Sequence, residues 1–184
     1  YNVAVGGQAM GDNTVGSKSV AVGYIALTSQ NPATATDMYN TAVGYQAGAG
    51  VTTGTHNTLL GGLSGDALTT STRNTALGYG TLSADTLGSH STAVGNLALV
   101  NQNFTTATDV YNTAVGSSAG QEITTGVQNT FVGGLAGDAL TTATKNTAVG
   151  YAALFKEMCG CNNSVLGYRA AESTTNDNNT AGYI

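Results

Sequence analysis

Charged residues are scarce in this chain: only 8% of its 184 residues are Asp, Glu, Lys or Arg. An ordinary globular domain carries about 25%. The chain also has one proline and no tryptophan. The helix formers Glu, Lys and Arg are rare, whereas Thr and Val, which favour strands, are common. This composition predicts an all-β chain and is typical of fibres built from stacked strands.

Net charge and the length of the apolar runs argue against a nucleic-acid partner and a membrane span. The formal net charge is −5 and the basic residues number only five, so a nucleic-acid partner is not expected. No apolar run approaches the ~20 residues that a membrane-spanning helix needs, so no membrane span is expected.

A five-residue motif with the consensus Asn-Thr-Ala-Val-Gly recurs along the chain. Successive motif glycines are 17 residues apart, except for two intervals of 21. A period this short predicts a parallel β-solenoid (a β-roll) of about ten turns, each of 17–21 residues. The motif glycines are Gly6, Gly23, Gly44, Gly61, Gly78, Gly95, Gly116, Gly133, Gly150 and Gly167.

The motif itself predicts a short strand. The residue before the glycine is always Val or Leu, as at Val43, Val115 and Val149, and we expect it to lie in the core. The middle residue, usually Ala, faces the other side of the strand. Each turn offers few large aliphatic side chains, so we expect the Ala side to pack against identical chains. Three parallel chains are the economical arrangement.

A glycine in every copy of the motif indicates a tight bend or a close approach of two backbones. We therefore assign a structural role to Gly44, Gly61, Gly78, Gly116, Gly133 and Gly150. The motif Asn predicts either a stacked side-chain ladder or a turn residue that bonds its own backbone. Segments such as Thr52-Thr53-Gly54 predict a second strand in each turn, ending at a glycine with positive φ.

The repeat also has a longer period of 72 residues. Residues 40–79 match residues 112–151 at 27 of 40 positions, which indicates two super-repeats at about 24–95 and 96–167. The two 21-residue turns should project their four extra residues as loops. Because both ends fall inside the repeat, we expect residues 1–184 to be one repetitive segment of a longer fibre.

The string Asn-Thr-Ala-Val-Gly-Tyr-Gln-Ala at 40–47 resembles two related groups of repeats. One is the head repeat of trimeric autotransporter adhesins, parallel β-rolls wound three around an axis, which usually have a shorter period. The other is the 17-residue repeat of bacteriophage tail fibres, which the spacing fits better.

The second resemblance implies a homotrimeric shaft in the virion tail. Such a shaft positions a host receptor-binding tip, joins other tail or baseplate proteins, and meets a host cell-surface glycan only through that tip. The alternative is the head of a trimeric adhesin on a bacterial surface, which binds host matrix or glycans itself.

The two projecting loops carry the candidate binding residues. The first loop contains Asp37 and Tyr39, and the second contains Asp109 and Tyr111. Loops on a rigid scaffold often carry binding residues, so these four are candidates for contact with a glycan or an ion; plain spacer loops are the alternative. The tyrosines that follow several motif glycines, such as Tyr45 and Tyr151, either pack over the turn or stack on sugars.

The sequence shows no catalytic pattern. Cys159 and Cys161 flank one glycine, a bridge between them would be strained, and the Cys-x₂-Cys spacing of zinc sites is absent. In a trimer they are candidate interchain thiols, and reduced thiols are the alternative. His56 and His90 share a column with Lys and Arg, which indicates a solvated face. We expect no enzyme activity, no metal site and no cofactor.

Overall fold

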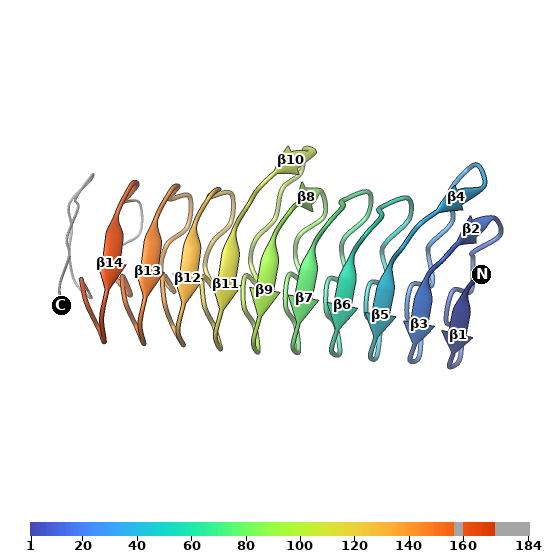
Figure 1. The fold of residues 1–184 in the computed structure, drawn as a ribbon, viewed down its shortest axis with the longest axis horizontal. Coiled ribbons are helices and arrows are strands. Elements are labelled where there is room, and N and C mark those ends of the chain that lie inside the picture. The colour runs from blue at the N-terminus through green and yellow to red at the C-terminus, as the bar shows by residue number, and fades with distance from the viewer. Residues whose placement is uncertain (157–159, 172–184) are drawn as a thin grey trace.

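The computed structural model describes residues 1–156 and 160–171, which form a parallel β-solenoid of about nine turns with no helix. Figure 1 shows the turns stacked along one axis, each contributing a strand to the same sheet. The all-β solenoid that the repeat predicts is confirmed.

Ten three-residue strands form this sheet. Every neighbouring pair is parallel and in register, so that Ala42 of one turn, for example, lies beside Leu59 of the next. In sheet order the strands are β1 (Val3–Val5), β3 (Val20–Val22), β5 (Thr41–Val43), β6 (Thr58–Leu60), β7 (Thr75–Leu77), β9 (Thr92–Val94), β11 (Thr113–Val115), β12 (Thr130–Val132), β13 (Thr147–Val149) and β14 (Ser164–Leu166).

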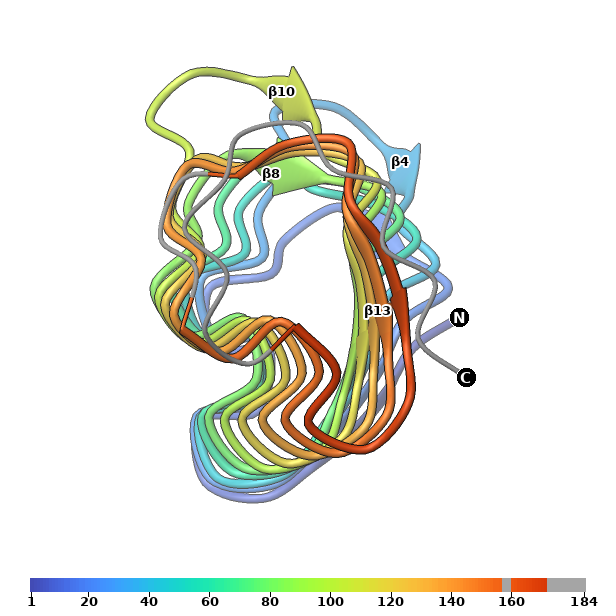
Figure 2. The ribbon, with the colours of Figure 1, turned by 90° about the vertical axis from the view of Figure 1, so that its left-hand side faces the viewer.

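Four two-residue strands form two smaller pairs. β2 (Gly16–Ser17) pairs with β4 (Thr36–Asp37), and β8 (Gly88–Ser89) pairs with β10 (Thr108–Asp109). Figure 2 shows β4 and β10 projecting beyond the outline of the other turns, as the extra residues predict. The prediction of a second strand in every turn is wrong: within the described residues, it forms only beside the two long turns.

The core lies on the side of the strands opposite to the predicted one. From the second turn onward the middle motif residue is buried, as at Ala42, Leu59 and Phe131, whereas Ala4 of the first turn is exposed. The residue before the glycine points outward: Val43 and Val115 are each 37% exposed, and Val149 is half-buried. The prediction that these three valines lie in the core is therefore wrong, as is the prediction that the Ala side packs against another chain.

Packing in the narrow interior explains this orientation. An Ala on the strand leaves room for a large side chain from the opposite wall, such as Leu27 or Leu99, both buried. Where the strand residue is itself large, the opposite wall has glycine. A Cβ atom on Gly65 would lie 2.8 Å from Leu59 Cδ2, and one on Gly120 would lie 2.8 Å from Phe131 Cδ2. Interior volume is thus conserved from turn to turn.

Both predicted roles of the motif glycines are observed. A Cβ atom on Gly78 would lie 2.7 Å from the carbonyl oxygen of Gly95 in the next turn, too close for any side chain. The φ angles also favour glycine: +140° at Gly44, +132° at Gly61, +136° at Gly78, +142° at Gly116, +132° at Gly133 and +133° at Gly150.

The glycines that end the predicted second strands differ from the prediction. Gly54 and Gly126 were expected to supply positive φ, but they are not among the residues with positive φ. A Cβ atom there would instead collide with the carbonyl oxygen of Ser71 or of Ala143 in the next turn. Close stacking, and not an unusual dihedral angle, requires glycine at these two positions.

The motif asparagines form a buried ladder, which decides between the two alternatives. The backbone N–H of Asn57 donates to Asn40 Oδ1 at 2.9 Å, and Asn40 Nδ2 donates to the Gly54 carbonyl oxygen at 2.7 Å. One side chain therefore joins two turns and also ties the strand to the opposite wall. Similar bonds involve Asn74, Asn112, Asn129 and Asn146.

At the second long turn, a glutamine and an aspartate complete the ladder. The motif begins with Ser91, and Gln102 Nε2 donates to Ser91 Oγ at 3.0 Å and to Asp85 Oδ2 at 2.6 Å. Gln102 Oε1 accepts from Asn112 Nδ2 at 2.9 Å. Asp85 is fully buried, and this burial raises the pKa of its carboxyl group, against the opposing effect of the bond from Gln102.

Replacing Gly61 by alanine should lower the free energy of unfolding by at least about 2 kcal/mol, because the new methyl group collides with the backbone of Gly78 at a φ of +132°. Its neighbour Gly62 is the control. A Cβ atom there would make an ordinary 3.5 Å contact with Tyr79, so Gly62→Ala should change stability by less than about 0.5 kcal/mol. Equal losses in urea unfolding would contradict the close-stacking explanation.

Asp85 should make stability fall as the pH rises. Its carboxyl binds a proton more tightly in the folded chain than in the unfolded one. Its contribution is therefore full below its ordinary pKa of 3.8 and is lost as the pH rises through the raised value. Asp85→Asn should flatten the dependence of the unfolding free energy on pH above 4, whatever its effect on absolute stability. Asp12→Asn, at an exposed carboxylate, is the control; equal slopes for Asp85→Asn and the parent chain would refute this role.

Candidate functional site

The outward side of the ten-stranded sheet carries three columns of side chains, one residue of each column per turn. The aliphatic column is the residue before each motif glycine, from Val5 to Leu166. The threonine column is two residues earlier, mostly Thr with valine in the first turns. The edge column is two residues earlier again: Tyr1, Lys18, Tyr39, His56, Arg73, His90, Tyr111, Gln128, Lys145 and Asn162.

No residue of the aliphatic column is buried: six of the ten are exposed and four are half-buried. At a strand separation of about 4.8 Å, its ten in-register residues extend over roughly 43 Å. Soluble monomers rarely expose long continuous apolar surfaces, which usually mark sites of association. The exposed fractions that exceed a third are 56% at Val5, 37% at Val43, 45% at Leu77, 37% at Val115, 36% at Val132 and 58% at Leu166.

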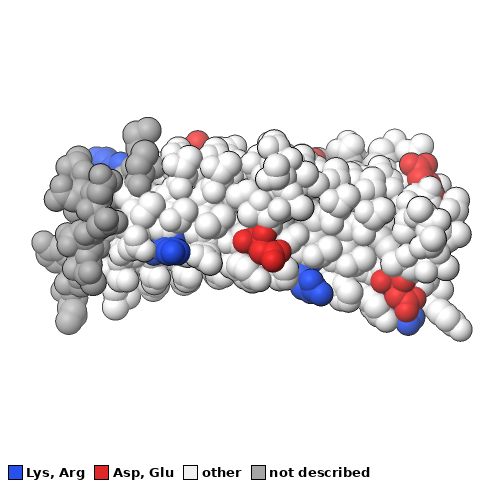
Figure 3. All heavy atoms as spheres, turned by 90° about the horizontal axis from the view of Figure 1, so that it is seen from above, with Lys and Arg blue, Asp and Glu red and all other residues white. Residues whose placement is uncertain are grey.

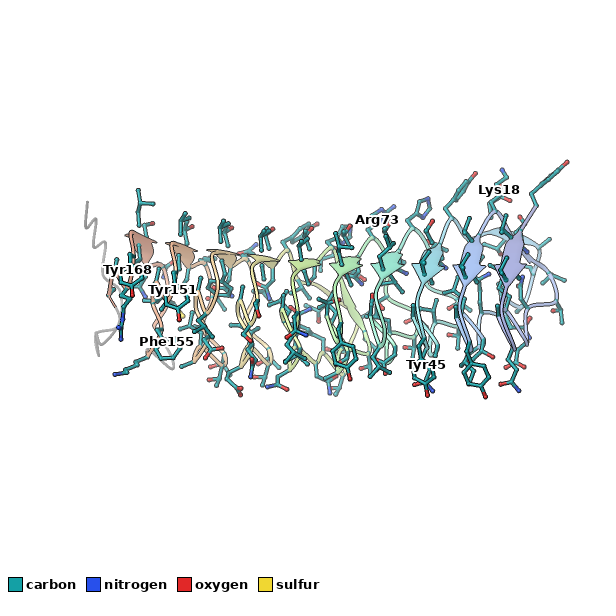
Figure 4. All side chains as sticks on the ribbon, turned by 90° about the horizontal axis from the view of Figure 1, so that it is seen from below. Lys18, Tyr45, Arg73, Tyr151, Phe155 and Tyr168 are labelled. Carbon is teal, nitrogen blue, oxygen red and sulfur yellow. The ribbon has the colours of Figure 1, made fainter. Side chains whose placement is uncertain are left out.

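The edge column lies where the chain turns into each strand. Its residues from Lys18 to Asn162 all have φ between 53° and 65°, the left-handed region that residues other than glycine seldom adopt. Figure 4 shows Lys18 and Arg73 pointing to the outward side of the sheet, well away from Tyr45. Figure 3 shows that charged side chains are few on the face that carries β4, β8 and β10.

The first pair of predicted binding residues lies in this column and beside it. Asp37 Oδ2 accepts from Lys18 Nζ at 2.7 Å and Asp37 Oδ1 from Ser17 Oγ at 2.6 Å. Tyr39 Oη lies 3.1 Å from Lys18 Nζ. The bond from Lys18, with that from Ser17, lowers the pKa of Asp37, and the Asp37 carboxylate raises the pKa of Lys18. The structure thus brings Asp37 and Tyr39 together around one ammonium group.

The second pair is arranged in the same way four turns later. His90 Nδ1 lies 3.1 Å from Asp109 Oδ1, and the rings of His90 and Tyr111 stack with their centroids 5.0 Å apart. The two pairs do not converge into one pocket, because about 19 Å separates positions four turns apart. Tyr39 and Tyr111 are 46% and 52% exposed, so both groups lie at the open surface.

Sequence reasoning missed the partners of these four residues. It assigned Asp37 and Asp109 to loops and left Lys18 and His90 in a solvated column. Aligning the turns by their motif glycines puts Lys18 next to Tyr39, and both beside the loop with Asp37. That signal was present, but only the parallel pairing of β2 with β4 turns it into a contact.

The tyrosines after the motif glycines pack over the turns. Tyr24 stacks on Tyr45 with ring centroids 5.9 Å apart, and Tyr151 stacks on Tyr168 at 5.6 Å (Figure 4). The Tyr79 ring lies over the backbone of Gly62 in the preceding turn. The packing alternative therefore accounts for this row.

The two cysteines are described only in part. Cys161 Sγ accepts from the Thr144 backbone N–H at 3.3 Å and from its hydroxyl at 3.5 Å, while Cys159 lies outside the described residues. A role as interchain thiols stays a prediction.

Within residues 1–156 and 160–171, no three His, Cys, Asp or Glu side chains gather closely enough to hold a metal ion. In the same part of the chain, none of the secondary structure is a helix of the length and hydrophobicity that a membrane crossing requires.

Comparisons with models of known protein families, with curated proteins and with solved structures find no match to this chain.

Replacing Asp37 by asparagine should lower the pKa of Lys18, because the carboxylate that stabilises its ammonium group is removed. NMR titration of the lysine side chain measures this shift. Asp12→Asn is the control, since Asp12 makes no ion pair within the described residues. An unchanged Lys18 titration in Asp37→Asn would show that the pair does not form in solution.

Proposed function

We propose that this chain is a shaft segment of a homotrimeric fibre in which three parallel copies bury their aliphatic columns around a common axis. The observation that carries the proposal is the row of Val and Leu side chains on the outward face, of which six are exposed and four half-buried. Burying apolar surface contributes about 25 cal/mol per Å², and the solenoid has no wall of its own to cover this row.

Parallel association suits this surface because the row repeats along the rod. Every turn presents Val or Leu at the same place, so identical chains aligned side by side match at each level without any bend or insertion. Repeating this contact around a common axis gives a closed ring of chains, and most homo-oligomers have closed rotational symmetry. The number three is supported by the resemblance of residues 40–47 to the repeats of trimeric fibres.

A structural role also fits the rest of the molecule. Backbone hydrogen bonds and the asparagine ladder join each turn to the next over the described length, which favours a stiff rod that resists shear and proteolysis. In a bacteriophage tail fibre, a shaft of this kind would hold a receptor-binding tip away from the tail or baseplate proteins. We therefore favour the tail fibre over the adhesin head.

Lysine substitutions in the aliphatic column test whether it is an interface between chains. Leu77→Lys combined with Val115→Lys places ammonium groups where the chains meet, and burying unpaired charges is strongly unfavourable. The assembly should dissociate to single chains in sedimentation velocity. Tyr45→Lys combined with Tyr79→Lys adds the same charge at exposed positions on another face and should leave the assembly intact.

Folding is checked separately, so that loss of assembly is not confused with loss of structure. Val115→Thr, which introduces a residue that neighbouring strands carry on the same face, should weaken association while the β-type circular dichroism stays unchanged. An unaltered mass in the lysine variant would rule out the aliphatic column as the interface.

A further inference from the structure

Basic side chains concentrate in the edge column. Three of the five Lys and Arg residues of the chain lie there, together with both histidines: Lys18, Arg73, Lys145, His56 and His90. The chain as a whole has a net charge of −5. Asp37 and Asp109 lie against Lys18 and His90, so Arg73 and Lys145 are the uncompensated positive charges of the column within the described part of the chain, and charges of this kind select and steer partners.

Flat aromatic surfaces alternate with the basic groups. The rings of Tyr39 and His56 lie 5.1 Å apart, and His90 and Tyr111 form the second such pair. Successive positions in the column are about 4.8 Å apart, close to the length of one pyranose residue in an extended polysaccharide. The Tyr39 ring lies between Lys18 Nζ, 5.2 Å from its centroid, and His56, so it offers a sugar its exposed edge and its hydroxyl group, and not a free face.

The residues of the edge column adopt a strained backbone conformation. A non-glycine residue in the left-handed region is strained by about 1–2 kcal/mol. Besides the motif glycines, the two other columns with positive φ have glycine at Gly48, Gly65, Gly80, Gly120 and Gly137 and other residues in the remaining turns. The edge column has no glycine in any turn. Strain of this kind collects at functional sites.

The pattern of the column repeats with the 72-residue period. Lys18, Tyr39, His56 and Arg73 are followed by the second set, His90, Tyr111, Gln128 and Lys145. In each set a basic group comes first and last, a tyrosine second and a planar nitrogen-bearing group third. A line of repeated groups on an open wall suits an extended polymer, whereas a compact ligand requires groups that converge.

We propose that the edge column binds a linear polysaccharide that carries carboxylate or sulfate groups. The sugars contact the exposed ring edges and hydroxyl groups of Tyr39 and Tyr111, and the acidic groups pair with Arg73 and Lys145, neither of which has an ion-pair partner within the described residues. The binding requires only that the edge column stays at the fibre surface, whatever the number of chains.

The carboxylates beside the column favour a glycan over a nucleic acid. Asp37 and Asp109 flank Lys18 and His90 at 2.7 Å and 3.1 Å, where they accept hydrogen bonds from sugar hydroxyls. A nucleic acid has a phosphate at every step and would meet both carboxylates at close range. Their repulsion lowers affinity for a uniformly charged strand more than for a glycan with spaced charges.

The test measures binding of fluorescent heparin and polygalacturonate at low ionic strength, with dextran as the neutral probe. Arg73→Gln combined with Lys145→Gln should weaken binding of both acidic probes about tenfold, from two surface charge pairs. Gln128 shows that the column accepts glutamine at a φ of 61°. The matched control, Lys156→Gln with Arg169→Gln, removes the same charge elsewhere, and Gln46 occupies the column of Arg169 at a φ of 55°.

Two further comparisons complete the test. Tyr39→Gln combined with Tyr111→Gln should weaken polysaccharide binding, and single-stranded DNA should bind less well than either acidic probe at equal charge. Equal losses in the two charge variants, no binding of either acidic probe, or equal binding of DNA would each overturn the proposal. The native mass is measured on the same samples, so that a single-chain mass with retained binding would refute the trimer and leave this site standing.

Discussion

The close stacking of one turn on the next is the constraint on which the rest of this molecule depends. At the motif glycines, neighbouring backbones approach so closely that no Cβ atom fits between them, as at Gly78 against Gly95. With the turns held this closely, backbone N–H and C=O groups pair across nearly every step of the strand. Side chains then fall into columns, and each column becomes a continuous stripe along the rod.

These stripes have different structural roles. The interior column conserves volume by exchanging Ala with Leu59 and Phe131 against glycines on the opposite wall, and the asparagine ladder satisfies the buried polar groups beside it. On the outward face, the aliphatic column belongs to the strands, whereas the edge column lies four residues earlier, where the chain turns into each strand. In the proposed fibre, the aliphatic column faces partner chains and the edge column stays at the surface.

The sequence was sufficient for the period and the two projecting loops, because both follow from the spacing of one motif; it predicted about ten turns, and the described residues form about nine. The sequence did not decide which side of the strand faces inward. Because side chains alternate along a strand, Val43 and Ala42 lie on opposite sides. Hydrophobicity alone then favours Val43 as the core residue. The deciding signal lay elsewhere: Leu59 occurs where Gly48 and Gly65 make room for it. At the candidate site, Asp37 and Tyr39 were found from their loop, whereas Lys18 was missed because its contact depends on pairing between turns.

The central claim is that the exposed aliphatic column is an interface between identical chains. The native mass of the unmodified protein tests it most directly, by light scattering after size-exclusion chromatography. The account predicts about three times the 18.3 kDa of a single chain. A folded species of 18.3 kDa, stable at high concentration, would contradict it, because the column from Val5 to Leu166 would then face water along its whole length.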